Sequence, residues 1–221
     1  MAKKIYNGAK NSKERSMQKL VDAVGCIIRT QGYTGLNSLN IAKAAGLNRA
    51  LINLYFGSLD NLVETYVRTK DYWVAASGNA GELMAENRNQ DTRDILESLL
   101  TNQLDYFSRE EEMQKIVLWQ LSQRSKIMFE IAEEREKLGA EFFNLADPYF
   151  ENTDVDIRAV AGLLVGGIYY MVLHAKSNDS LFCQIDVNSK TGLDRMKKAI
   201  SEILTDTYKK AAAAKRKHDN N

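Results

Sequence analysis

The sequence predicts an all-α protein with a small basic N-terminal domain followed by a larger helical domain. Apolar residues recur at three- and four-residue spacing along most of the chain, and its 221 residues include a single proline. Residues 1–56 hold nine basic and two acidic residues, a net charge of +7, so the rest of this chain of net charge +1 carries −6. A basic module on an acidic body is typical of a nucleic-acid binder with a separate second domain.

Residues 32–56 contain the most informative local pattern, two short helices joined by a tight turn. The Asn37 side chain can cap the first helix by accepting a free backbone N–H. Gly46 suits the left-handed conformation that ends a helix, and Asn48 can cap the helix that follows. These features predict a helix-turn-helix, whose second helix lies in the major groove of DNA with its N-terminal residues against the base edges.

Each of these two helices should turn an apolar face inward. We expect that face to consist of Leu39, Ile41, Ala42, Ala45, Leu51, Leu54 and Tyr55. Leu47, Ile52 and Phe56 are also expected to pack inside the domain. Arg49, Ala50 and Asn53 are then left to point outward, toward DNA.

The same segment resembles the DNA-binding domain of the tetracycline-repressor (TetR) family over about residues 13–65. The shared patterns are Gly-aromatic-x-Gly at 32–35, Ile-Ala-x-x-Ala-Gly-Leu at 41–47 and Tyr-Phe-x-Ser at 55–58. The resemblance implies a three-helix DNA-binding domain on a larger helical domain that binds an effector and dimerises. Asn53 and Leu59 stand where the family usually has a Tyr and a Lys, so those contacts do not carry over.

The residue types in the motif predict distinct roles on DNA. Arg49 is expected to read guanine through two hydrogen bonds, and Asn53 to read adenine or, alternatively, to contact phosphate. Lys43, Asn48 and Tyr55 are expected to position the protein on phosphates. The full set of DNA-binding candidates is Asn37, Lys43, Asn48, Arg49, Ala50, Asn53 and Tyr55.

Apolar periodicity and capping residues predict the other helices. We expect helices over about residues 12–30, 58–76, 91–107, 108–121, 125–146, 153–173 and 191–210. Ser108-Arg109-Glu110-Glu111 matches a capping box, and the acidic run that follows fits the start of a helix rather than a metal site. Pro148 should end or kink its helix. Residues 78–90 are expected to form a loop or a short frayed helix, and residues 211–221 a frayed tail.

The segment Ala159–Leu173 contains no charged residue, yet it is too short to cross a bilayer, so we expect burial on more than one side. Gly162 and Gly166 are four residues apart, a spacing that lets another helix approach closely. The last two helices could therefore form a four-helix bundle between two chains, although they could also form the core of a monomer. The interface candidates are Gly162, Gly166, Tyr169, Ile200, Ile203 and Leu204.

The expected domains are residues 1–57, which bind DNA, and residues 58–221, which bind an effector and dimerise. A pocket in the larger domain should be mostly apolar with a few polar anchors. Its candidate lining residues, each of which could instead be ordinary core, are Tyr106, Trp119, Met128, Phe142 and Tyr170.

Little in the sequence favours an enzyme, a metal site or a cofactor. The two histidines are His174, at the end of an apolar helix, and His218, in the tail, so no histidine-based catalytic cluster can be assembled. Cys26 and Cys183 lack metal-ligand spacing and are expected to be free thiols. The N-terminus lacks the apolar core of a signal peptide, so we expect a cytoplasmic protein.

These observations predict a homodimeric transcriptional regulator, most often a repressor, that binds a palindromic or near-palindromic DNA operator and responds to a small-molecule effector. The alternative is a constitutive DNA-binding or architectural protein whose larger domain only dimerises.

Overall fold

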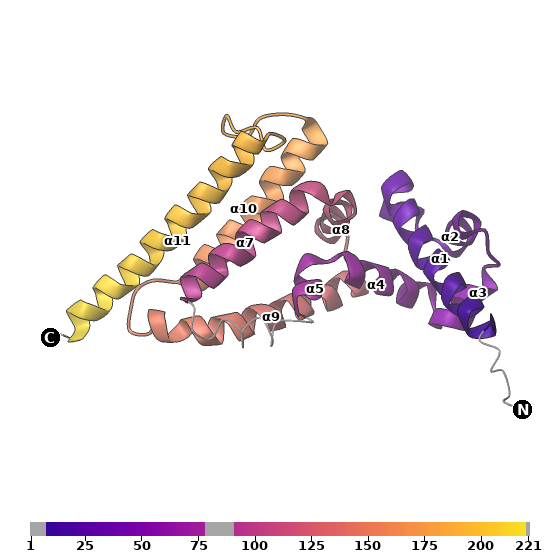
Figure 1. The fold of residues 1–221 in the computed structure, drawn as a ribbon, viewed down its shortest axis with the longest axis horizontal. Helices are drawn as coiled ribbons and strands as arrows, with labels where there is room; N and C mark the ends of the chain where they lie inside the picture. Colours follow the sequence, from indigo (N-terminus) through magenta and orange to yellow (C-terminus); the bar gives the residue numbers. More distant parts are fainter. Residues whose placement is uncertain (1–7, 78–90, 220–221) are drawn as a thin grey trace, which may run out of the picture. The chain divides into compact units, whose positions relative to one another are not determined.

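The structure is a computed structural model that describes residues 8–77 and 91–219, and all regular elements within these ranges are helical (Figure 1). The elements are α1 (Gly8–Gln31), the 3-10 helix η1 (Tyr33–Gly35), α2 (Ser38–Ala45), α3 (Ala50–Phe56), α4 (Leu59–Lys70), α5 (Tyr72–Ser77), α7 (Thr92–Arg109), α8 (Glu111–Ser122), α9 (Lys126–Phe150), α10 (Ile157–Asn178) and α11 (Lys190–Asp219). The all-α prediction is confirmed. The segment 78–90, expected as a loop or frayed helix, lies outside the described residues.

The chain divides into two compact units. The first contains residues 1–71 and 115–130, and the second contains residues 72–114 and 131–221. Helices α8 and α9 each begin in one unit and end in the other. The functional division between residues 57 and 58 stays a prediction, because contacts alone do not define where functions separate.

In the first unit, α1 packs against α2 and α4, and α3 packs against α4. The expected apolar stripe of α1 points into this core, where Leu20 and Val24 are fully buried. Gly25 allows the close approach of α4, since a Cβ there would lie 2.6 Å from the Tyr66 hydroxyl oxygen. The Ser58 side chain caps α4 by accepting the Asn61 backbone N–H at 3.0 Å, as its sequence position predicts.

Two leucines of the helix-turn-helix lie on the opposite side from the one predicted. Leu39 and Leu54 were expected to face inward, but they are 67% and 71% exposed. The reason is helical geometry: each lies two residues, or about 200°, from a fully buried isoleucine on its own helix, Ile41 or Ile52. Burial of the isoleucines therefore turns both leucines to the surface.

The end of α8 and the start of α9 belong to the first unit and pack against its N-terminal helices. The Trp119 ring stacks on the Tyr33 ring with 5.7 Å between centroids and 3° between planes. Ser122 Oγ donates to the Tyr33 hydroxyl at 3.3 Å, and Lys115 Nζ donates to the Arg29 carbonyl at 2.5 Å. A segment from far along the sequence thus completes the unit that holds the helix-turn-helix.

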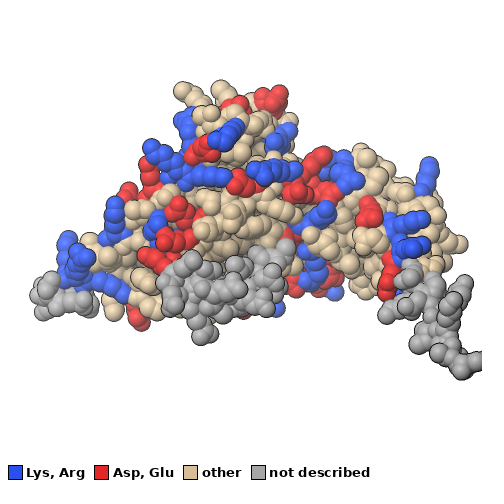
Figure 2. All heavy atoms as spheres, viewed as in Figure 1, with Lys and Arg blue, Asp and Glu red and all other residues tan. Residues whose placement is uncertain are grey.

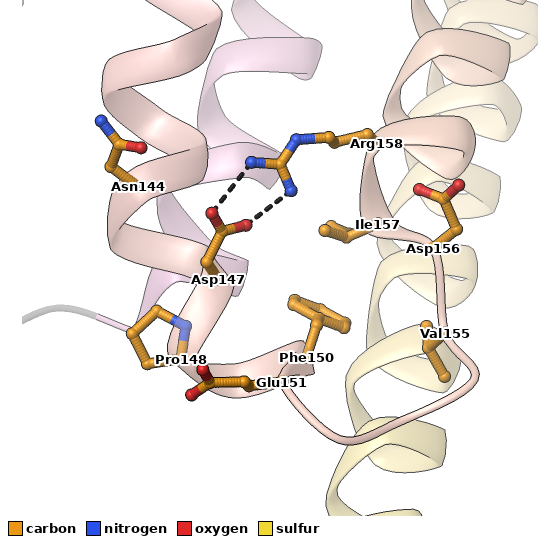
Figure 3. Close-up of a pocket in the computed structure, with 9 residues that line it drawn as sticks. All are labelled: Asn144, Asp147, Pro148, Phe150, Glu151, Val155, Asp156, Ile157 and Arg158. Carbon is orange, nitrogen blue, oxygen red and sulfur yellow. Dashed lines mark hydrogen bonds and ion pairs between the residues drawn. The ribbon is translucent and has the colours of Figure 1, made fainter.

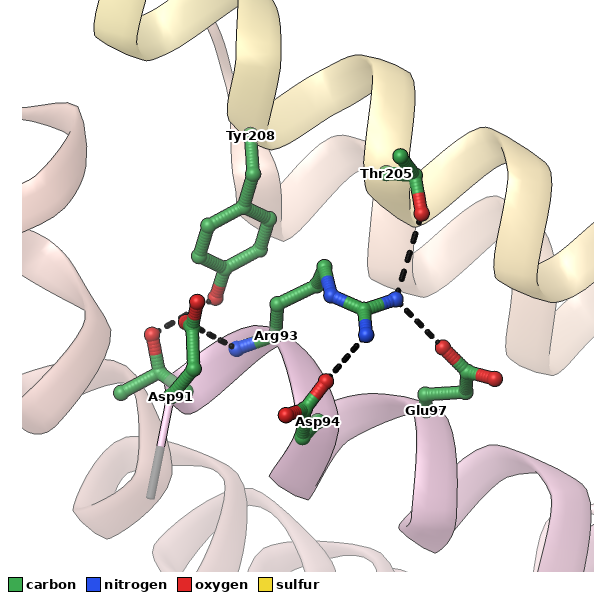
Figure 4. A network of polar contacts seen from close by, with 7 residues as sticks. Asp91, Arg93, Asp94, Glu97, Thr205 and Tyr208 are labelled. Carbon is green, nitrogen blue, oxygen red and sulfur yellow. Dashed lines mark hydrogen bonds and ion pairs between the residues drawn. The ribbon is translucent and has the colours of Figure 1, made fainter. Parts of the chain in front are cut away.

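In the second unit, α7 packs against both α10 and α11, and the three helices run side by side in Figure 1. Figure 4 shows how Arg93 joins the start of α7 to α11: its Nη1 donates to Glu97 at 2.6 Å and to Thr205 Oγ1 at 3.2 Å. The Tyr208 hydroxyl hydrogen-bonds the Thr92 hydroxyl at 2.9 Å. Burial raises the pKa of Tyr208 to about 12, so this contact stays uncharged over the physiological range.

Several predicted helix boundaries are wrong, and the helix expected over residues 58–76 is divided into α4 and α5. Ser108 does not open a capping box, because it lies inside α7 and its hydroxyl donates to the Asp105 carbonyl at 2.9 Å. Helix α10 begins later than expected, after Asp156, whose side chain accepts the Ala159 N–H at 2.9 Å. The expected tail after residue 210 is instead part of α11, which continues to Asp219.

Pro148 lies inside α9, which continues for two residues beyond it and ends at Phe150. The proline has no backbone N–H to donate to the carbonyl of residue 144, so the helix loses that hydrogen bond and ends soon afterwards. The helix therefore ends two residues after the proline, at Phe150.

Within this chain, α10 is buried on one face only, contrary to the expectation of burial on more than one side. Ile157, Ala161, Ile168 and Val172 face the interior. The opposite face remains apolar and exposed, and it consists of Ala159, Gly162, Leu163, Gly166 and Tyr170. The described part of the chain places no second layer of helix over this face.

Candidate DNA-binding surface and effector site

The helix-turn-helix has the local geometry that its sequence predicts. The Asn37 side chain accepts the Asn40 backbone N–H at 2.9 Å, and the Asn48 side chain accepts the Ala50 N–H at 2.9 Å. Gly46 adopts the left-handed conformation with φ 65° and ψ 34°, and the following N–H, of Leu47, donates to the Ala42 carbonyl at 3.0 Å. Both caps and the turn between them are confirmed.

The surface of α3 presents a compact mixture of polar and apolar side chains. Arg49, just before α3, and Ala50, Asn53 and Leu54 within it are all exposed, whereas Ile52 is 1% exposed. Asn37, Lys43 and Asn48 are also exposed on the same motif, and Tyr55 is half-buried. The structure thus places most of the predicted DNA-binding side chains where a ligand can reach them.

Two further residues join this surface that were not predicted to belong to it. Lys13 on α1 places its ammonium 5.7 Å from the centroid of the Tyr55 ring, a cation–π contact that adds a positive charge beside α3. Leu54 adds an exposed apolar side chain. A helical-wheel test based on Ile52 would have found Leu54, but the contact of Lys13 with Tyr55 depends on how α1 packs.

The structure does not bring the five predicted pocket residues together. Trp119 and Met128 belong to the first unit, where Trp119 stacks on Tyr33 and Met128 is buried. The other three belong to the second unit. Among them, Phe142 is buried in the core against Phe143, while Tyr170 is 55% exposed beside His174 and Phe182.

Tyr106 lies in a cluster of aromatic and polar side chains formed by α5, α7 and α10. Its ring is 5.6 Å from that of Tyr72, which begins α5 and whose hydroxyl donates to the Leu99 carbonyl at 3.1 Å. Nearby, Trp73 Nε1 donates to the Tyr169 hydroxyl at 3.0 Å. Burial, and secondarily Tyr169, raises the pKa of Tyr72 to about 12, so its phenol is neutral.

An open pocket of about 580 Å³ lies where the end of α9 meets the start of α10 (Figure 3). Its main polar feature is an exposed ion pair in which Arg158 donates to both carboxylate oxygens of Asp147, at 2.5 and 2.9 Å. The hydrogen bonds from Arg158 hold the pKa of Asp147 below its ordinary value. Because both charged groups already satisfy each other, this pocket offers little to an effector.

A second open pocket, of about 420 Å³, lies within the first unit. Tyr33, Leu36 and Val63 line one part of it, and Trp119 and Ile127 line another. This pocket lies between the segment 115–130 and the N-terminal helices of the first unit.

The six dimer-interface candidates also separate into two groups. Ile200 and Leu204 lie in the core of the second unit, and Tyr169 contacts Phe107 and Trp73, so these three already pack within their own chain. The other three are exposed: Gly162 and Gly166 on α10, and Ile203 on α11. Figure 2 shows acidic and basic side chains mixed over the visible face of the second unit, so no large patch of one sign dominates there.

Two general features bear on the class of protein. Among the described residues, no group of three or more His, Cys, Asp or Glu side chains is arranged to hold a metal ion. By length and composition, α10 could cross a membrane, but a packed core helix passes the same test, so this is weak evidence.

The fold matches solved structures of transcriptional regulators over most of their length. A putative fatty acid metabolism regulator from Clostridium perfringens aligns with 83% of this chain and 97% of its own, at 19% identity and a TM-score of 0.60. A TetR-like regulator from Rhodococcus sp. RHA1 aligns over 84% and 93%, at 18% identity and a TM-score of 0.59. The chain has the fold of the TetR-type regulators.

Another structure with the TetR fold is that of FadR from Bacillus subtilis in complex with stearoyl-CoA. It aligns with 85% of this chain and 96% of its own, at 17% identity and a TM-score of 0.56. No protein-family model matches the sequence, and no curated protein matches it significantly. At these identities the TetR likeness establishes the fold alone.

Proposed function

We propose that the protein is a homodimeric transcriptional regulator that binds a near-palindromic DNA operator and releases it when a small molecule binds the second unit. The observation that carries this proposal is the exposed face of α3, where Arg49, Ala50, Asn53 and Leu54 project from a module of net charge +7. Solved proteins with this fold are regulators, which supports a regulator rather than an enzyme, acting in the cytoplasm.

In this proposal each subunit places α3 in a major groove, and the two half-sites lie about 34–36 Å apart or at a multiple of that spacing. Arg49 reads guanine, and Asn53 reads adenine or contacts phosphate. Lys43, Asn48, Tyr55 and Lys13 position the domain on the DNA backbone, where their donors meet phosphate oxygens.

The test is selection of bound sequences from a random duplex library by the full-length protein, followed by affinity measurement at several salt concentrations. We expect a two-fold symmetric consensus and an affinity for it at least about a thousandfold above that for random duplex. A consensus that consists of one asymmetric half-site would contradict the proposal that the protein binds DNA as a symmetric dimer. Binding without any sequence preference would instead favour the architectural alternative.

We further propose that Leu54 contacts the C5-methyl group of a thymine. Its side chain is 71% exposed one helical turn after the exposed Ala50 and next to Asn53, and apolar contact is how proteins read that methyl group. Replacing each selected thymine by deoxyuridine, which lacks the methyl, should weaken wild-type binding about fourfold at one position per half-site, the equivalent of about 0.8 kcal/mol. The Leu54→Ala variant should lose that sensitivity at the same position.

Leu39→Ala is the matched control for this experiment, because Leu39 is 67% exposed but lies on α2. The loss of binding free energy caused by Leu39→Ala should be the same on every deoxyuridine duplex as on the unmodified duplex. Fluorescence anisotropy on the full set of duplexes gives the coupling for each pair. If the Leu54→Ala variant loses as much affinity on every deoxyuridine duplex as on the unmodified duplex, Leu54 contacts no thymine methyl group. That result would leave the proposal of a sequence-specific operator unchanged.

The dimer is proposed to form through the exposed apolar face of α10 together with Ile203 of α11. An exposed contiguous apolar face on a protein of this size commonly marks an interaction site. The effector is proposed to be a small, largely apolar molecule, as the aromatic cluster around Tyr72 and Tyr106 favours; the FadR of Bacillus subtilis holds stearoyl-CoA, which also has a long apolar part.

A further inference from the structure

The second unit contains a buried amide that makes no hydrogen bond. Gln103 on α7 is 0% exposed, and neither its Nε2 nor its Oε1 has a partner. An amide has two N–H donors and an acceptor with two lone pairs, so the whole capacity of this side chain is unused. Because solvent does not reach either atom, a bound water does not satisfy it in this conformation.

Gln103 lies on the face of α7 that meets α5 and α10. The residues one helical turn later on this face are Tyr106, which contacts Tyr72 of α5, and Phe107, whose ring is 4.8 Å from that of Tyr169 on α10. The turn before it holds Leu99, whose carbonyl accepts the Tyr72 hydroxyl. The unpaired amide is therefore surrounded along its helix by an aromatic cluster.

A buried amide without partners destabilises the protein, because it loses its hydrogen bonds to water on folding and gains none. An apolar side chain of similar size would avoid that loss. The same chain shows the ordinary arrangement at Gln114, which is also buried but whose Nε2 donates to the Phe107 carbonyl at 2.7 Å. Gln103 thus stands out as a polar group whose partner is missing.

We propose that Gln103 is the polar anchor of the effector site, and that its ligand is an uncharged, largely apolar molecule with one group that both donates and accepts hydrogen bonds, such as a carboxamide. This inference rests on the proposed function and gives its effector a chemical class. A carboxamide can pair with Gln103 through two parallel hydrogen bonds, and the rings of Tyr72, Tyr106 and Phe107 supply apolar surface.

The preference for an uncharged ligand follows from the groups around the amide. The hydroxyls of Tyr72 and Tyr169 are engaged by Leu99 and Trp73, and the Tyr72 phenol is neutral. These residues offer no formal charge to balance an ion, and an unpaired charge in such surroundings is costly.

The described conformation is closed around Gln103, so a ligand must separate α5 from α7. That movement breaks the hydrogen bond between Tyr72 and Leu99. Tyr72 is the first residue of α5 and directly follows Asp71, the C-cap of α4, so a movement of α5 is passed along the chain to the helix that follows the helix-turn-helix. A ligand that favours the open form over the closed one then shifts the population of the DNA-binding state.

The experiment uses 2-naphthamide, 2-naphthoate and naphthalene as probes, with binding to the full-length protein measured by calorimetry. We expect 2-naphthamide to bind at least tenfold more tightly than either of the others. Gln103→Leu should abolish this preference, and so should Gln103→Met, which keeps the side-chain length if the leucine variant folds poorly. Without any ligand, Gln103→Leu should raise Tm by roughly 2–4 °C.

Gln114→Leu is the matched control, and we expect it to lower Tm because it removes the donor to the Phe107 carbonyl. The proposal is overturned if wild type does not prefer 2-naphthamide, if the preference survives in both Gln103 variants, or if Gln103→Leu lowers Tm as Gln114→Leu does. These ligand-binding measurements are made without DNA, so they test the Gln103 site independently of the proposed function. A separate measurement of operator affinity with and without 2-naphthamide tests the release. If the protein prefers 2-naphthamide but its operator affinity is unchanged, the effector-release function is contradicted and the Gln103 site is not.

Discussion

Replacing Leu163 with arginine is expected to convert the proposed dimer into a monomer without unfolding the chain. Leu163 is 78% exposed at the centre of the apolar face of α10, so the single chain tolerates a charged side chain there. In a two-fold dimer the change occurs on both sides of the interface, and each buried guanidinium would lack a partner. We expect the dissociation constant of the dimer to rise at least about a hundredfold, or about 2.7 kcal/mol.

Sedimentation velocity at low micromolar concentration, with circular dichroism to check the fold, measures this effect. Leu121→Arg is the control, since Leu121 is 73% exposed on α8 and belongs to the first unit, whereas the proposed face belongs to the second. Gly166→Leu provides a second probe, because a Cβ at Gly166 meets no atom of its own chain within 4 Å. If the Leu163→Arg protein remains dimeric, the interface does not include this face of α10. If the wild-type protein is monomeric, the proposal of a two-fold symmetric operator is wrong.

Arg49→Ala is expected to cause the largest loss of sequence-specific DNA binding. One bidentate contact to guanine discriminates by roughly 1–3 kcal/mol, and the dimer makes it twice, so the selected operator should lose roughly 2–6 kcal/mol. Random duplex should lose much less. The motivation is that Arg49 is exposed and directly precedes α3, where recognition helices meet base edges.

Lys43→Ala is the control for Arg49, because a phosphate contact carries no sequence information. It should weaken binding to operator and random duplex about equally and lower the slope of log K against log salt by about one unit for each subunit. Binding isotherms on both duplexes at four salt concentrations separate the two behaviours. Equal losses on both duplexes for Arg49→Ala would exclude it from base reading.

Local features of the DNA-binding module could be predicted from sequence because short-range chemistry decides them. The caps at Asn37 and Asn48 and the left-handed Gly46 each depend on residues within a few positions. The positions of Leu39 and Leu54 were predicted wrongly, because both helices are short and rich in apolar residues on two sides. Ile41 and Ile52 were expected inside, as observed, and helical geometry then places each leucine about 200° away, on the exposed side.

The candidate effector site was harder to predict, because it depends on contacts between distant segments. Trp119 and Met128 have the residue types of a pocket lining, yet tertiary packing places them in the first unit. Gln103 has the residue type of an exposed helix position, and its sequence gives no sign of complete burial. Only the structure shows that its amide is buried and unpaired.

The discontinuity of the first unit has a consequence for synthesis on the ribosome. The N-terminal stretch to Asp71 emerges first, but the segment 115–130 that completes the unit follows roughly 60 residues later, a delay of roughly 3–12 s at bacterial and eukaryotic elongation rates. During that time Tyr33 lacks the Trp119 ring that later stacks on it. The nascent first unit therefore gains its full set of contacts only after α7, α8 and the start of α9 have been translated, and we expect its N-terminal helices to be less stable until then.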